Sequence, residues 1–108
     1  MERAVFVYTT WPSIVEAEEA GRSLVERQLA ACVNILPRMI SVYRWKGAIE
    51  TAQETPMLLK TTRVQAAALK DFLVARHPYE TPAVVALDVL ADASHGEFLA
   101  WVAAETTR

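Results

Sequence analysis

The sequence predicts an α+β fold of the ferredoxin-like type, a split β-α-β sandwich with a long β-hairpin and a C-terminal helix. Two observations predict it. Apolar segments of strand character and segments of helical periodicity follow one another in the order β-α-β-β-α-β-α. A length of 108 residues is enough for one core and too short for two, so residues 1–108 are expected to form a single domain.

The first strand and the first helix follow from the opening residues. Residues 4–10 form a continuous β-branched and aromatic run, which is typical of a strand at the centre of a sheet. Ser13, with Glu16 three residues later, predicts a capping box and therefore the start of a helix. That helix is expected to end near Ala30–Ala31, and its apolar stripe contains Ile14, Ala17, Gly21, Leu24, Val25 and Leu29.

A long hairpin is predicted next. Residues 32–36 open a strand, and Pro37 predicts a bulge or an edge position because proline cannot donate to the ladder. Lys46–Gly47 predicts the turn of the hairpin, and the polar residues 52–56 interrupt its returning side. The hairpin is expected to extend beyond its own domain, with extended segments at residues 39–46, 48–51 and 57–61.

The second helix is predicted from a second capping box. Thr62 and Gln65 have the required spacing, and Pro78 stops the helix after Arg76. Its apolar stripe is expected to contain Val64, Ala68, Leu69, Phe72 and Leu73.

The last strand and the last helix complete the pattern. Residues 83–90 show little alternation, which indicates a strand covered on both faces. Ser94 and Glu97 give a third capping box before a short terminal helix. Two helices then cover one face of the sheet, and the other face needs cover from the terminal helix, another subunit or both.

Composition narrows the classes of partner. Eleven basic against 13 acidic residues leave a formal charge of -2, which argues against binding nucleic acid or anionic lipid. The apolar fraction of 53% and the mean hydropathy of +0.15 indicate apolar surface left for partner subunits, so a homo-oligomer is expected. A single cysteine, no secretory signal and no apolar run of about 18 residues predict a cytoplasmic protein without a membrane segment.

No catalytic motif stands out. The three glycines are scattered, so no phosphate-binding loop is present, and no nucleophile elbow or metalloprotease pair occurs. Cys32 lies beside Ala31 and Val33, where a buried inert thiol is the common outcome. The sequence therefore predicts a protein that is not an enzyme, and it identifies no cofactor beyond a candidate divalent cation.

The candidate metal ligands are few. Cys32, His77 and Glu80 are the donors of interest, although they lack a recognised metal-binding spacing. His77 closes a helix just before two prolines, so we expect its ring at a rigid, exposed edge, suited to copper or zinc. The alternative is that His77 caps the C-terminus of that helix. His95 is expected to be solvated, and Tyr43, Trp45, Trp11 and Trp101 to pack in the core or at subunit interfaces.

Several blocks in order along nearly the whole chain resemble the CutA divalent-cation-tolerance family. These blocks are residues 24–37 (Leu-Val-Glu through Leu-Ala-Ala-Cys-Val-Asn-Ile-Leu-Pro), 41–47 (Ser-Val-Tyr-Arg-Trp-Lys-Gly), 57–62 (Met-Leu-Leu-Lys-Thr-Thr), 77–80 (His-Pro-Tyr-Glu) with Pro82, and 99–102 (Leu-Ala-Trp-Val).

The resemblance implies a cytosolic homotrimer whose long hairpins pair with neighbouring subunits, similar in architecture to the trimeric signal transducers of nitrogen regulation. It implies a role in tolerance of copper and other divalent cations, with metal binding at His77 in the His-Pro-Tyr motif and no enzymatic activity. Arg76 stands where members proposed to bind copper have a second histidine. Cys32, Glu50, Tyr79 and Glu80 match family positions near the cleft between subunits. The leading hypothesis is weak cation binding at such clefts, and the alternative is a trimeric regulatory module without a specific metal site.

Overall fold

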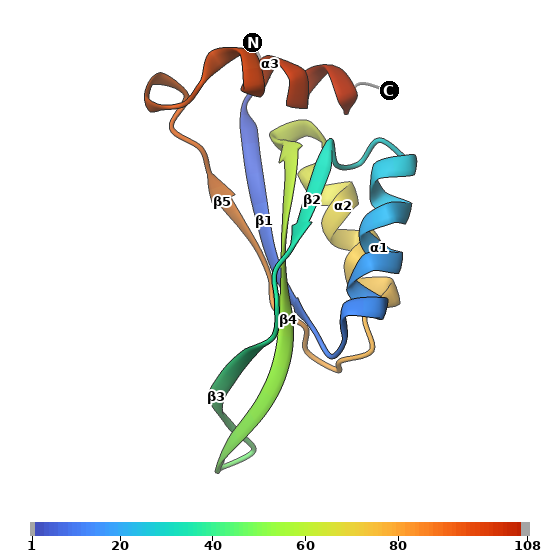
Figure 1. Ribbon diagram of the computed structural model, residues 1–108, viewed down its shortest axis with the longest axis vertical. Coiled ribbons are helices and arrows are strands. Elements are labelled where there is room, and N and C mark those ends of the chain that lie inside the picture. The colour runs from blue at the N-terminus through green and yellow to red at the C-terminus, as the bar shows by residue number, and fades with distance from the viewer. Residues whose placement is uncertain (1, 107–108) are drawn as a thin grey trace.

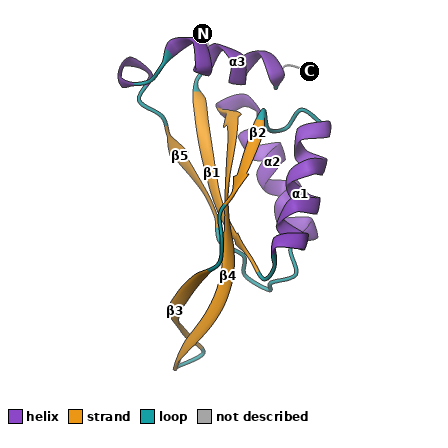
Figure 2. Ribbon diagram, viewed as in Figure 1, coloured by secondary structure: helices purple, strands orange, loops and turns teal. Residues whose placement is uncertain are grey.

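The computed structural model, which describes residues 2–106, is a mixed α+β fold built on one antiparallel sheet (Figures 1 and 2). Two helices lie on one side of the sheet, and the third crosses its upper end in Figure 1. Among residues 2–106, no helix is long and apolar enough to cross a membrane. The elements are β1 (Ala4–Trp11), α1 (Ile14–Glu26), β2 (Cys32–Ile35), β3 (Met39–Trp45), β4 (Ala48–Thr62), α2 (Arg63–Arg76), β5 (Val84–Asp88), a 3₁₀ turn (Ala91–Ala93) and α3 (Gly96–Glu105).

The strand order confirms the split β-α-β pattern. The main sheet runs β2-β4-β1-β5, so β4 lies between the two strands that α1 connects. Strand β1 pairs with β4 from Ala4 opposite Thr62 to Trp11 opposite Thr55, and with β5 on its other side. As predicted, the apolar run after residue 3 is a central strand.

Strand β4 is continuous over 15 residues, so the predicted interruption at residues 52–56 is wrong. Pro56 is tolerated because its nitrogen, which has no hydrogen to donate, points to the same side as its carbonyl, toward the bulged segment between β2 and β3. The carbonyl accepts from the Leu36 N–H at 3.0 Å. Three residues there, 36–38, lie opposite two on β4, because Ile35 pairs with Met57 and Met39 with Glu54. This is the bulge that Pro37 predicts.

Strand β3 and the distal half of β4 form an arm that projects below the rest of the molecule in Figure 1. Lys46 and Gly47 form its two-residue turn with positive φ angles of 50° and 84°. Two left-handed residues are what a type I′ turn requires. The predicted overhanging hairpin and its turn are confirmed.

Helix α1 begins as predicted but ends earlier. The Ser13 hydroxyl accepts from the Glu16 N–H at 3.2 Å and donates to the Glu16 carboxylate at 2.9 Å. The helix stops at Glu26, not near residue 30, because Gln28 is left-handed with φ 59°. The Gln28 N–H bonds Val25 O and the Leu29 N–H bonds Leu24 O, both at 3.0 Å. These are the two bonds of a Schellman motif, here with glutamine in place of the usual glycine.

The capping box predicted for α2 does not form. Thr62 is the N-cap, but its side chain makes no capping hydrogen bond. Gln65 instead donates to the Thr106 carbonyl at 2.7 Å, and the free Val64 N–H is capped by the Glu2 carboxylate at 3.2 Å. A spacing of three residues permits the box, but distant segments here offer the competing partners.

The box predicted for α3 is also wrong. His95 is the N-cap of this helix and makes no side-chain capping bond. Ser94 closes the preceding 3₁₀ turn, and its hydroxyl donates to the Leu90 carbonyl at 2.6 Å.

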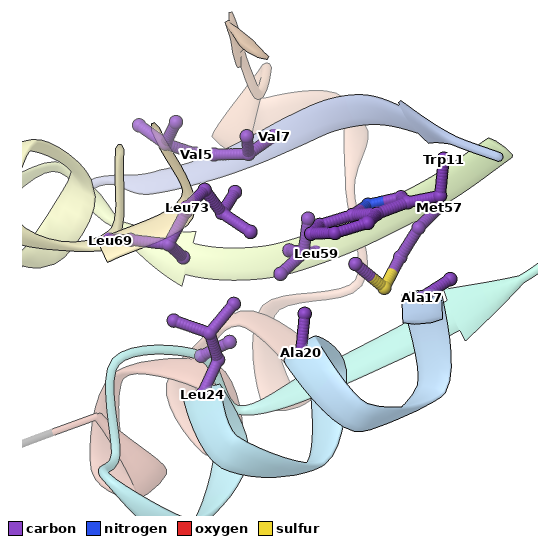
Figure 3. Close-up of a cluster of buried hydrophobic side chains, with 11 residues drawn as sticks. Val5, Val7, Trp11, Ala17, Ala20, Leu24, Met57, Leu59, Leu69 and Leu73 are labelled. Atoms are coloured by element: carbon purple, nitrogen blue, oxygen red, sulfur yellow. The ribbon is translucent and has the colours of Figure 1, made fainter. Parts of the chain in front are cut away.

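The core lies between the sheet and helices α1 and α2 (Figure 3). Helix α1 enters it through small residues, and a Cβ added at Gly21 would lie 2.8 Å from Val33 Cγ2. Its fully or nearly buried members are Val5, Val7, Trp11, Ala17, Ala20, Leu24, Ala30, Met57, Leu59, Leu69 and Leu73. The expected stripes are only partly right, because four of their residues are exposed: Ile14, Val25, Val64 and Ala68.

The face of the sheet opposite α1 and α2 is mostly apolar, and it is uncovered along β5. We call it the open face; strand alternation places on it Phe6, Tyr8, Leu58, Lys60, Val85 and Leu87. Val85 is 49% exposed and Leu87 47%, so β5 is not covered on both faces as its sequence predicts. Within one chain the terminal helix crosses the upper end of the sheet in Figure 1, where Ala4 and Thr62, which alternation places on this face, are buried, whereas β5 stays exposed.

Candidate functional site

A cluster of aromatic and polar side chains joins the end of α2 to β1 and to the base of the arm. His77 is the C-cap residue of α2, with φ −72° and ψ 138°. The ring of Pro78 excludes the helical conformation from the residue before it, which explains why the helix stops there. The chain turns back and brings His77 against the last residues of β1.

The His77 ring is buried, with 8% exposure, so the expected exposed position is wrong. Its Nε2 lies 2.7 Å from the Thr10 carbonyl, and its Nδ1 accepts from the Tyr79 N–H at 3.1 Å. Because a carbonyl only accepts and a backbone N–H only donates, the ring is neutral and carries its proton on Nε2. The ring stacks on Trp11 at 4.1 Å between centroids. The predicted capping of α2 by this side chain is replaced by a bond to β1.

Tyr79 extends the cluster to the arm. Its ring centroid lies 4.7 Å from that of His77, and its hydroxyl donates to Glu54 Oε2 at 2.8 Å. Burial, followed by the hydrogen bond to the Glu54 carboxylate and its negative charge, raises the pKa of Tyr79 above its usual value. Tyr79 therefore keeps its proton and holds the loop after α2 to strand β4.

The predicted metal ligands are not gathered in one chain. His77 has one lone pair on its ring, and the Tyr79 N–H occupies it, whereas a metal-binding imidazole must offer that lone pair. Glu80 is exposed. Cys32 lies at the start of β2, opposite Lys60, whereas His77 contacts Thr10, which pairs with Pro56 four residues away along β4. Residues 2–106 contain no group of three His, Cys, Asp or Glu side chains that could hold a metal ion.

Cys32 lines a shallow groove between α1 and β2. The thiol is free and the residue is half-buried, not enclosed as an inert core thiol would be. The groove has a volume of about 380 Å³, and its other walls include Gly21, Arg22, Glu26 and Val33.

A second groove, of about 400 Å³, lies on the helix side of Trp11. Glu16, Ser23, Arg76 and Pro78 line it. The guanidinium of Arg76 rests on the ring of Phe72, at 3.8 Å from the centroid. The carboxylates of Glu16 and Glu19 also line the groove, so its charged groups are two negative charges and the one positive charge of Arg76.

Sequence reasoning missed Thr10 and Glu54. Thr10 contributes a backbone carbonyl, which leaves no signal in the side-chain pattern. Glu54 lies in the segment expected to interrupt β4, and only the strand register brings it to Tyr79.

Comparisons with known proteins agree on one family. A family model described as "CutA1 divalent ion tolerance protein" matches residues 5–105. The divalent-cation tolerance protein CutA of Thermus thermophilus is 41% identical over 106 residues, which cover 98% of this chain and 99% of that protein. Protein CutA of Homo sapiens is 42% identical over 95 residues, covering 88% of this chain. The match spans 52% of the human protein, about half of its length.

Solved structures match over nearly the whole chain. The periplasmic divalent cation tolerance protein CutA of Archaeoglobus fulgidus has a TM-score of 0.90 at 38% identity, covering 96% of this chain and 99% of that one. The "PII-like protein CutA" from Nostoc sp. PCC 7120 in apo form has a TM-score of 0.88 at 32% identity, covering 95% and 97%.

Proposed function

Because the chain belongs to the CutA1 divalent ion tolerance family, we propose that it is a non-catalytic protein of divalent-cation tolerance that works as a homotrimer. The observation that carries the proposal is the apolar surface of the arm. Ile40 is 69% exposed, Val42 68% and Ile49 62%, and the open face adds Val85 and Leu87. Several large apolar side chains left exposed on one element, as on this arm, are typical of an interface. The apolar excess in the sequence predicts a homo-oligomer, so we take the partners to be identical chains.

The cation, copper or zinc, is proposed to bind weakly at clefts between chains. Glu80 supports this because its carboxylate is exposed on the loop that follows α2. His77 lies three residues away, and it becomes a ligand only after Nδ1 gives up the Tyr79 N–H. Cys32, half-buried at the start of β2 and opposite Lys60 in the register, is the third candidate ligand.

The second candidate function is a trimeric regulatory module without a specific metal site. The occupied nitrogens of His77 favour it, because the imidazole of the predicted metal site is already satisfied by the fold. The likeness to a protein titled PII-like favours it too.

Calorimetric titration with Cu(II) and Zn(II) separates the two functions. Cation binding at the proposed clefts predicts a saturable heat that Glu80→Gln and His77→Asn reduce and that Glu105→Gln, a control on α3, leaves unchanged. Equal heats in all four proteins, or no saturable heat, favour the regulatory module. Light scattering over a range of concentrations tests the assembly, and a folded 12 kDa particle at every concentration would contradict both.

We also propose that the protein works in the cytosol. The single cysteine supports this because it is free and cannot form a disulfide within the chain. Cell fractionation with an antibody tests it, and recovery from a periplasmic extract would contradict it.

A further inference from the structure

Lys60 lies in an unusual place for a lysine. It is only 9% exposed, although its neighbours in β4, Leu59 and Thr61, fill the opposite face of the sheet. Strand alternation therefore puts the Lys60 side chain on the open face. Phe6 on β1 and Cys32 on β2 lie directly opposite it in the register.

The charge of Lys60 is incompletely balanced within one chain. Its ammonium donates to the Asn34 Oδ1 and lies 5.6 Å from the centroid of the Phe6 ring. None of the ion pairs among residues 2–106 includes Lys60. An ammonium has three donors, and burial of a charge is costly unless an opposite charge and further hydrogen bonds compensate it.

The apolar side chains beside Lys60 would leave its positive charge even less compensated in an assembly. The row across the sheet continues from Phe6 to Leu87, which is 47% exposed, and the next row ends at the 49% exposed Val85. When two copies associate, half-exposed apolar side chains such as these become covered. The covering surface then also removes the remaining water from the Lys60 ammonium. A carboxylate in the covering surface is the group that would compensate it.

We infer that Lys60 is one half of an ion pair between copies of this chain, completed by a carboxylate of the copy that covers the open face. The chain can supply the opposite charge itself, because it has 13 acidic against 11 basic residues. Apolar neighbours on both sides favour a protein surface over a dissolved anion as the source of that carboxylate. The inference rests on the proposed assembly. It adds that Lys60 lacks a carboxylate partner until a second copy binds.

Zero-length cross-linking tests the ion pair in the unmodified protein. A carbodiimide joins an ammonium to a carboxylate only when the two are in direct contact. The protein is made as a mixture of ¹⁴N and ¹⁵N chains, and cross-linked peptides are identified by mass spectrometry. We expect Lys60 in a peptide pair of mixed isotopes, and its partner identifies the carboxylate. Cross-links from Lys60 only within one chain, or none while other residues link between chains, would overturn the inference and leave the assembly standing.

Two variants and a control give an independent test. Lys60→Met leaves the partner carboxylate unpaired, so the concentration at which the assembly half-dissociates should rise by about tenfold or more. Lys60→Arg keeps the charge and should restore part of the effect. The control Lys70→Met removes a lysine charge from the exposed face of α2 and should change nothing.

Three outcomes separate the ways in which the inference can fail. Equal dissociation of Lys60→Met and the unmodified protein would refute the ion pair alone, whereas an unmodified protein that stays monomeric would refute the assembly as well. If added phosphate stabilises the unmodified protein but not Lys60→Met, and protein concentration has no effect, the counter-charge comes from solution and the inference is wrong.

Discussion

Replacing Gly21 with alanine has two effects of opposite sign on stability, and the structure allows us to compare them. An alanine inside a helix is favoured over glycine by about 0.8–1.0 kcal/mol, so helix propensity alone predicts a more stable protein. The new Cβ, however, would lie 2.8 Å from Val33 Cγ2 and 3.2 Å from Met57 Sδ. Inserting a methyl group into a packed core costs about 1–3 kcal/mol. The balance depends on how easily these two neighbours move.

The structure indicates that they yield with difficulty. Val33 is β-branched and therefore stiff at χ1, and its backbone is held opposite Leu59 in the sheet. Met57 is flexible, but it is fully buried. We therefore expect Gly21→Ala to lower the free energy of unfolding by about 1 kcal/mol, which corresponds to a melting temperature lower by roughly 4 °C.

Urea denaturation at one fixed protein concentration measures the effect, because an assembly makes stability depend on concentration. Adding Val33→Ala to Gly21→Ala removes the clash, so the two substitutions should couple favourably by about 1 kcal/mol in a double-mutant cycle. Gly96→Ala is the control, since no atom lies within 4 Å of its added Cβ, and it should not destabilise the protein. A Gly21→Ala protein more stable than the unmodified one would refute the packing argument.

Three further predictions follow from the loop geometry. Gln28→Gly removes a side chain from a left-handed position and should stabilise the protein by about 0.5–1 kcal/mol in urea denaturation; a loss of stability would contradict the Schellman assignment. His77→Ala should cost about 2–4 kcal/mol, measured in the same way, because it leaves the Thr10 carbonyl without its donor and opens a cavity beside Trp11; a change below about 0.5 kcal/mol would mean that the ring is dispensable. Tyr79 has a pKa raised by burial and Glu54, so the folded state keeps a proton that the unfolded state loses. Its contribution is present below pH about 10 and lost as the pH rises further, by up to about 1.4 kcal/mol per pH unit, and Tyr79→Phe should flatten that decline while Tyr8→Phe should not.

Local chemistry predicted much of the fold. Strand and helix periods, the glycine turn of the arm and the proline bulge each depend on a few adjacent residues, so the sequence alone is sufficient to find them. Ser13 and Glu16 cap α1 as predicted, because no distant group competes for the N–H. The capping boxes predicted for α2 and α3 do not form, because Gln65 donates to the Thr106 carbonyl and Ser94 to the Leu90 carbonyl.

The candidate site was predicted only in part. His77 and Tyr79 stand out in the sequence, but the loop geometry decides what they bind. His77 was expected to be exposed, and it is buried because its two nitrogens match a carbonyl of β1 and the N–H of Tyr79. Whether Glu80 and Cys32 take a metal stays a prediction.

The amino-acid sequence determined the order of elements, the arm, and the excess of apolar residues over what one chain can bury. Each of these depends on composition or on spacing along the chain. The tertiary structure decided where α1 stops, that β4 runs unbroken past Pro56, and that His77 bonds Thr10. It also placed Lys60 in an apolar face without a carboxylate among the described residues. These features depend on contacts between residues far apart in sequence, and strand register and helix packing fix such contacts only when the whole sheet has formed.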